Sequence, residues 1–204
     1  MNNFSLSRSR DKVLAEHVED AWGNRYEIDP DFHTVLRCLR VLTDPDISTE
    51  DALYLLMLWF FKGVYVADAV GLFAAFLRDD EQEHDPEPPM MDYEQDADVI
   101  YASFLREYGI DLLDTGMHWA KFRALLSGLS EHSALAARMR IRDTDTKNLK
   151  GKDKARAERA KRRVALKERI SAEEKSIQEE LERSLAAGED PAPILAKIRN
   201  MGGE

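Results

Sequence analysis

Apolar residues recur every three or four positions through most of residues 29–143, a spacing typical of amphipathic helices. Six short helices are predicted there, separated by capping residues, glycines and prolines. Asp29, placed before a proline, is expected to begin the first helix. Asp68, Asp92 and Ser130 are expected to begin the third, fourth and sixth helices, and the fifth helix covers roughly residues 115–129. The pattern therefore predicts a mainly all-α fold, a compact bundle of about six helices.

The second predicted helix differs from the others because its apolar residues surround it. Ser48 followed by Asp51 forms the pattern of a capping box, and the run over residues 53–61 contains no charged residue before Lys62. A helix without a polar face must be covered on most sides, so we expect this helix to be the central element, with Leu56 in the core. The run is about half of the roughly twenty residues needed to span a bilayer, so no membrane span is expected.

Three segments lie outside this helical pattern. Residues 1–17 are polar and are expected to form a flexible N-terminus. Residues 18–28 carry aromatic and branched side chains around Gly23-Asn24, which predicts a small β-hairpin. Residues 79–91 contain three prolines and no Lys or Arg, which predicts an exposed acidic loop. The predicted core domain covers residues 18–144.

A charged helical extension is predicted over residues 145–204. Residues 147–169 carry eleven Lys and Arg against three Asp and Glu, whereas residues 170–190 carry two against seven. Between residues 145 and 187 there is no proline and one glycine, which predicts one long helix of about 36 residues and about 54 Å. Its apolar stripe is thin, so this helix is expected to protrude, to pair with another helix, or to remain partly disordered.

Charge and cysteine content exclude some classes of protein. The formal net charge of −10 argues against generic nucleic-acid binding by the whole molecule, because phosphate contacts need a basic face. Cys38 is the only cysteine, so one chain forms neither a disulfide nor a cysteine-based zinc site, and Cys38 is expected to pack in the core. The N-terminus lacks the apolar segment of a signal peptide. These features suit a reducing cytoplasm.

No residue pattern predicts an active site, a cofactor or a metal. The carboxylates of Asp92, Glu94, Asp96 and Asp98 come closest, but side chains two residues apart on a helix point in different directions, and a helix start favours acidic residues. His118 lies in an apolar helix and is expected to be buried and hydrogen-bonded. The sequence contains no nucleophile elbow, no phosphate-binding loop and no dinucleotide fingerprint, so an enzyme is not predicted.

Several segments of the chain occur in an order and spacing that are found together in a known protein family. They are YEQDADVIYASFLREYGIDL (93–112), HWAKFRALLSGLS (118–130), YEIDPDFHTVLRCLRVLTDPDIS (26–48), FKGVY (61–65) and MRIRD (139–143). Together they resemble a family of tailed-phage and prophage proteins called gene-product fifteen, over about residues 18–150. The resemblance implies a tail-assembly chaperone that keeps the tape-measure protein soluble until tail-tube subunits coat it. The family has no known catalytic residues, so none is implied here.

The predicted function is that of a non-catalytic tail-assembly chaperone in the cytoplasm of the bacterial host. Its partner would be the tape-measure protein or another tail protein, and it would itself be able to form a homo-oligomer. One alternative is a structural virion protein, such as a minor tail or connector component. Another is a nucleic-acid-binding accessory that uses residues 147–169, although acidic residues follow at once and interleaved aromatic side chains are absent. Partner binding is assigned to Lys154, Arg156, Arg159, Arg162, Arg163, Ile177, Leu181 and Leu185.

Overall fold

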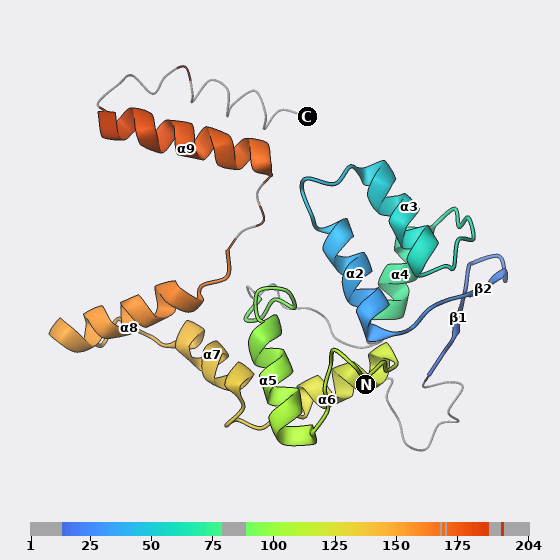
Figure 1. Cartoon of the computed structure of the whole chain (residues 1–204), viewed down its shortest axis with the longest axis horizontal. Helices are drawn as coiled ribbons and strands as arrows, with labels where there is room; N and C mark the ends of the chain where they lie inside the picture. Colours follow the sequence, from blue (N-terminus) through green and yellow to red (C-terminus); the bar gives the residue numbers. More distant parts are fainter. Residues whose placement is uncertain (1–13, 79–88, 168, 170, 188–192, 194–204) are drawn as a thin grey trace.

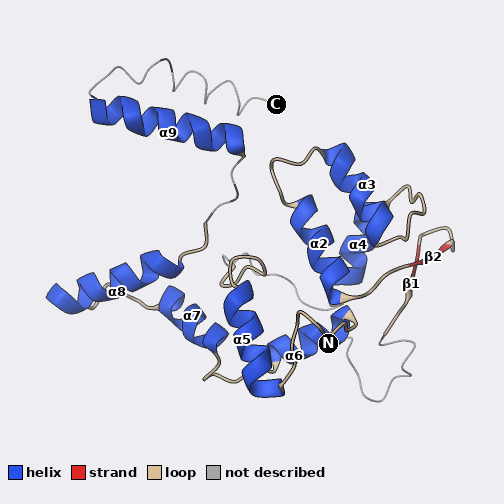
Figure 2. Ribbon diagram, viewed as in Figure 1, coloured by secondary structure: helices blue, strands red, loops and turns tan. Residues whose placement is uncertain are grey.

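The computed structural model describes residues 14–78, 89–167, 169, 171–187 and 193. This part of the chain is mainly helical with one small antiparallel hairpin, as predicted (Figures 1 and 2). The elements are β1 (His17–Glu19), β2 (Arg25–Glu27), α2 (Phe32–Leu42), α3 (Thr49–Trp59), α4 (Ala69–Leu77), α5 (Ala97–Tyr108), α6 (Trp119–Ser127), α7 (Ala134–Asp143), α8 (Gly151–Val164) and α9 (Ala172–Ala187). Residues 1–13 of the predicted N-terminus and residues 79–88 of the predicted acidic loop lie outside the described residues.

The N-terminal hairpin forms where the sequence predicts it. Strands β1 and β2 pair in antiparallel register, with Val18 opposite Tyr26. The carboxylate of Asp20 closes the turn by accepting hydrogen bonds from the backbone and side chain of Asn24. Gly23 has a φ of +82°, a left-handed conformation that glycine adopts without the steric cost of a side chain.

Aromatic side chains of α2, α5 and α6 form one part of the core, and Phe60, Phe61 and Phe73, from the end of α3 and from α4, form another. The ring of Phe122 stacks on Phe32, Phe104 and Trp119, with centroid separations of 4.7, 5.4 and 5.6 Å. Such pairs contribute roughly 0.5–1.5 kcal/mol beyond the burial of their area. Cys38 is fully buried, which confirms its predicted place in the core, and this burial raises the pKa of its thiol to about 12.

Helix α3 does not occupy the central position that its apolar sequence predicts. Leu56 is fully buried, as expected, but Tyr54 is 61% exposed and Leu58, one turn later on the same face, is 43% exposed. The helix lies at the edge of the bundle, where α2 and α4 cover only part of it (Figure 1). Phe60 and Phe61, at the end of the predicted apolar run, are fully buried, and the Phe60 ring lies 4.8 Å from Phe73 and 5.1 Å from Phe76 of α4. The run therefore supplies part of the core without being covered on most sides.

Four helix starts differ from the predicted ones, among them that of α6, which begins at Trp119 rather than at about residue 115. Helix α2 is capped by Asp31, whose side chain accepts from a first-turn amide. Helix α5 begins at Ala97 rather than at Asp92, because the Asp92 carboxylate caps a separate preceding turn instead. Helix α7 begins after Ser133, whose side chain caps it, whereas Ser130 bonds elsewhere. Each of these three predicted caps is a polar residue of the right kind, two to four positions before the observed N-cap.

Candidate partner-binding arm

The long helix predicted over the charged extension is instead two helices, α8 and α9. Helix α8 packs on α7, and residues 165–167, 169 and 171, which belong to no helix or strand, lead to α9, which lies apart from the bundle (Figure 1). We refer to residues 151–187 as the arm. The helix-forming composition of this segment does not explain the interruption, but contacts between the arm and the bundle do.

Side chains of the bundle bond to the backbone of the arm where α8 ends. The Arg142 Nε–H donates to the carbonyl oxygen of Val164 at 2.5 Å. The Gln95 side-chain amide then bonds to both backbone groups of Lys167: its Oε1 accepts from the Lys167 N–H at 2.8 Å, and its Nε2 donates to the Lys167 carbonyl at 2.9 Å. A continuous helix would use these backbone groups internally. The bonds to Gln95 therefore favour the extended conformation.

Two acidic side chains hold the rest of the extended segment. The Arg169 guanidinium lies 3.0 Å from the Asp92 carboxylate and also donates to the hydroxyl of Thr43. The backbone N–H at Ala172, where α9 begins, donates to Asp46 at 2.7 Å. We call the four bundle residues Asp46, Asp92, Gln95 and Arg142 the clasp. The clasp is the physical reason that the predicted single helix is divided.

Asp96, beside the clasp, is a fully buried carboxylate. The Arg142 guanidinium bonds to both of its oxygens at 2.7 Å, and Arg138 lies 3.3 Å away. Burial alone would raise the pKa of Asp96, but the hydrogen bonds from Arg142, the Asp92 N–H and Arg138, together with the charge of Arg142, lower it below its ordinary value. Asp96 does lie at the start of α5, as its N-cap residue, but its side chain makes no capping bond and is half of a buried ion pair.

The remaining acidic residue of interest, Asp98, is exposed but also paired. Its carboxylate receives two bonds from the Arg138 guanidinium, at 2.7 and 2.8 Å, and these bonds lower the pKa of Asp98. Of the four carboxylates weighed as metal ligands, Asp96 and Asp98 thus bind arginines of α7, and Asp92 pairs with Arg169. Among the described residues, no three His, Cys, Asp or Glu side chains gather in a way that would hold a metal ion.

Helix α8 presents a basic stripe on its outward face. At about 100° per residue, Lys152, Arg156, Arg159 and Arg163 fall within roughly 60° of one another around the helix, and all four are exposed. On the other side of the helix, Lys161 is half-buried and its Nζ donates to the carbonyl of Thr144 at 2.7 Å, next to α7. We call the four exposed residues the basic stripe. It offers an aligned row of cations about 16 Å long.

The structure separates the basic residues predicted for partner binding into two groups. Arg156, Arg159 and Arg163 belong to the basic stripe, whereas Lys154 and Arg162 are exposed on other sides of α8. Lys154 lies 3.9 Å from Glu158. Sequence reasoning missed Lys152, although its spacing of four residues from Arg156 is the signal that would have found it.

The apolar residues predicted for partner binding lie on α9. Ile177 is buried, with 9% of its surface exposed, and Leu181 is half-buried. The backbone of Leu185 is part of α9, but its side chain lies outside the described residues. Ile177 is therefore not available as a surface contact in this conformation.

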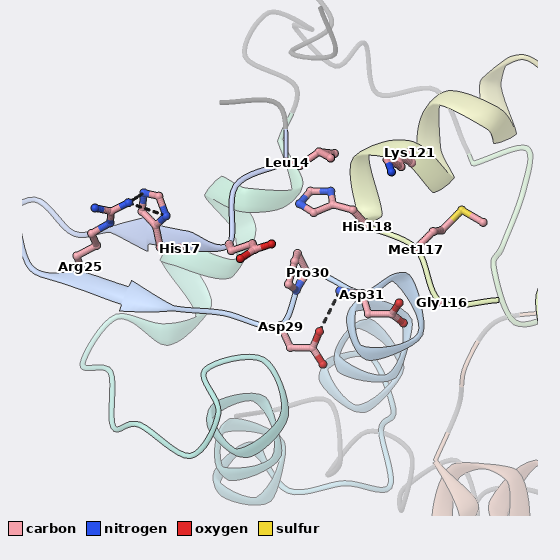
Figure 3. Close-up of a pocket in the computed structure, with 11 residues that line it drawn as sticks. Leu14, His17, Arg25, Asp29, Pro30, Asp31, Gly116, Met117, His118 and Lys121 are labelled. Carbon is pink, nitrogen blue, oxygen red and sulfur yellow. Dashed lines mark hydrogen bonds between the residues drawn. The ribbon is translucent and has the colours of Figure 1, made fainter. Parts of the chain in front are cut away.

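A cavity of about 600 Å³ opens between the hairpin and the start of α6, and its polar residues serve the fold (Figure 3). His118 caps α6 with Nδ1, which accepts from the Ala120 N–H at 3.0 Å, while Nε2–H donates to the Ala15 carbonyl at 3.1 Å. These bonds require the neutral ring, and burial lowers the pKa of His118. His118 is hydrogen-bonded, as predicted, but half-buried and at the start of its helix. Both ring nitrogens are occupied, so the ring is not placed to act as a base.

The described residues thus define a small helical bundle with a clasped, basic arm, and no described helix is long and apolar enough to cross a membrane. A family described as "Bacteriophage Gp15 protein" matches residues 65–166. Because the match covers half of the chain, the chain belongs to this family of bacteriophage proteins. No curated protein matches the chain, and no solved structure does.

The matched range differs from the range over which the sequence resembled the family. It begins at residue 65, so the segment over residues 26–48 lies outside it, and it continues past residue 150 to the end of α8. The clasp residues Asp92, Gln95 and Arg142 and the whole basic stripe lie inside the matched range. The start of the arm is therefore part of the family domain rather than an addition to it.

Proposed function

We propose that this phage protein is a tail-assembly chaperone that binds the tape-measure protein, or another tail component, through the basic stripe of α8. The observation that carries the proposal is the row of four exposed cations on an arm helix inside the family-matched range. The bonds between α8 and the bundle turn these cations away from α7. A surface of this kind fits a partner helix with an acidic face.

Charge complementarity supports recognition and fast association more than tight binding. Interfacial charge pairs steer encounter and fix orientation, while apolar contacts supply most of the affinity. Tyr54 and Leu58 of α3 are exposed apolar side chains of the sort that such contacts use. Binding by the basic stripe should therefore weaken, but not vanish, as salt shortens the Debye length from about 10 Å at 0.1 M to about 3 Å at 1 M.

The experiment is co-expression with the tape-measure protein of the same phage, followed by pull-down at low and high salt. A variant with Arg156→Glu, Arg159→Glu and Arg163→Glu reverses the stripe, and Lys154→Glu with Arg162→Glu is the matched control off the stripe. We expect the wild type and the control to retain soluble tape-measure protein and the stripe variant to lose most of it.

Four outcomes would oppose the proposal. If the tape-measure protein is equally insoluble with and without this protein and no tail protein is retained, the chaperone function is wrong. If both charge-reversed variants behave alike, the stripe is not the contact. Stoichiometric recovery of the protein from finished virions would favour a connector or minor tail component, and salt-sensitive retention of nucleic acid by the stripe would favour the nucleic-acid accessory.

A further inference from the structure

The contacts between the clasp and the arm have the character of peptide recognition. Gln95 bonds to both backbone groups of Lys167, and Asp46 accepts from the backbone N–H of Ala172. Contacts of this kind recognise an extended main chain, and they do not require that chain to be covalently attached to the bundle. The Arg169 side chain adds sequence selectivity through its ion pair with Asp92 and its bond to the Thr43 hydroxyl.

The connection between α7 and the arm can rearrange. Helix α8 begins at Gly151, which has a φ of +55°, and the preceding residue, Lys150, makes no side-chain capping bond. The connecting residues 144–150 contain two local bonds, from the Leu149 N–H to the Thr146 carbonyl at 3.3 Å and from the Lys147 N–H to the Asp145 carboxylate at 2.8 Å. No residue of α8 is buried. Moving α8 away from α7 therefore exposes little apolar surface, and glycine permits the change in backbone direction.

We infer that the clasp is a binding site for an extended basic segment, and that it accepts this segment from a second copy of the chain as well as from its own. The occupant is the same arm, residues 151–187, exchanged between two copies. A second copy is the favoured partner because its arm carries every group that the clasp bonds in cis, so that each bond broken within one chain is remade between two chains. This inference does not depend on the proposed tail-assembly function.

Effective concentration decides which form is populated. A tethered arm is present at its own clasp at an effective concentration on the order of millimolar, so the closed monomer prevails in dilute protein. Exchange prevails when the protein is concentrated or when the arm cannot reach its own clasp. The second condition can be imposed by shortening the connection between α7 and α8.

The geometry sets how much shortening is needed. Lys161 bonds to the carbonyl of Thr144, so residues 144–150 must run back along α8 from near Lys161 to its start at Gly151, a distance of about 15 Å. Seven extended residue steps span up to about 25 Å, whereas four span only about 14 Å. Deleting residues 146–148 therefore leaves a connection too short for α8 to pack on its own α7, while packing on the α7 of another copy stays open.

The test compares full-length proteins by size-exclusion chromatography with light scattering. We expect the chain lacking residues 146–148 to be a dimer at a concentration where the wild type is a monomer. A control with Lys147→Gly and Asn148→Ser, which keeps the length, should remain a monomer. The wild type should dimerise as its concentration rises toward the millimolar range, and a Gln95→Ala, Arg169→Ala variant should not. These two substitutions leave the Asp92 cap and the buried Asp96 pair intact.

Hydrogen exchange at the Lys167 amide identifies the contact. This amide bonds to Gln95, so it should be protected both in the wild-type monomer and in the shortened dimer. A shortened chain that stays monomeric with a fast-exchanging Lys167 amide would overturn the inference. So would a shortened dimer that persists unchanged when Gln95→Ala and Arg169→Ala are added, because association would then use another surface.

Discussion

Replacing Arg142 tests the link between the bundle and its arm most directly. Only 9% of the Arg142 side chain is exposed, and its guanidinium bonds to both oxygens of the fully buried Asp96. The same group donates to the carbonyls of Met90 at 2.8 Å and Val164 at 2.5 Å. Arg142→Met keeps an unbranched side chain but removes these donors. Asp96 would then keep the Asp92 N–H and the longer contact to Arg138.

The expected loss of stability is large. Removing one partner of a buried ion pair costs about 3–5 kcal/mol, because it leaves a buried charge without compensation. A typical domain has a free energy of unfolding of about 5–15 kcal/mol. At about 2–4 °C per kcal/mol for a protein of this size, Tm should fall by about 6–20 °C. The control is Arg138→Met, whose shorter bonds go to the exposed Asp98 and should contribute no more than about 1 kcal/mol.

The assay is thermal and chemical unfolding of Arg142→Met, Asp96→Asn and the double variant. Asp96→Asn removes the buried charge, so the double variant should be more stable than Arg142→Met alone. Because the pKa of Asp96 is lowered, its ionised form stabilises the fold above the ordinary value of 3.8, and this stabilisation is lost as the pH falls below that value. If Arg142→Met stays within about 1 kcal/mol of the wild type, the pair does not hold the bundle together.

Two further predictions concern the helix cap and the core. Because the pKa of His118 is below its ordinary value of 6.5, mainly through burial, the unfolded chain takes up the proton first, so stability should begin to fall as the pH drops below 6.5. His118→Ala should cost about 1 kcal/mol at neutral pH and flatten this pH dependence of Tm, and an unchanged slope would refute the assignment. Leu56→Asp should unfold the domain, since an unpaired buried charge costs several kcal/mol, whereas Tyr54→Asp, two residues away and exposed, should leave the circular-dichroism melt nearly unchanged. A folded Leu56→Asp protein would contradict the observed packing.

The parts of the fold that the sequence predicted correctly depend on local signals. Ser48 and Asp68 cap α3 and α4, and Gly109 ends α5 with a φ of +65°. Gly23 makes the hairpin turn. Each of these features is decided by residues within about four positions, where side-chain caps and glycine conformations act. The count of six helices before the extension followed from these signals.

The parts that the sequence could not predict depend on partners far apart in the chain. Asp96 pairs with Arg142, 46 residues later, and Gln95 bonds to Lys167, 72 residues later. Helix propensity over residues 151–187 favours one continuous helix, and no residue pattern within that segment predicts the interruption. The exposure of Tyr54 has the same origin: an apolar helix is covered only as far as its neighbours reach, and α3 lies at the edge.

The contacts that interrupt the arm also orient the basic stripe. Lys161 donates to the Thr144 carbonyl, and Arg142 donates to the Val164 carbonyl at the end of α8. These two bonds constrain rotation of the C-terminal half of α8 about the helix axis. Because the side of α8 that carries Lys161 is turned toward α7, Arg156 and Arg163 on the opposite side must point outward. The buried pair of Asp96 and Arg142 thus helps to set the direction in which the basic stripe faces, although neither residue belongs to the stripe. Loss of Arg142 should therefore weaken retention of a partner even at temperatures where the bundle stays folded, whereas reversal of the stripe should weaken retention without lowering Tm.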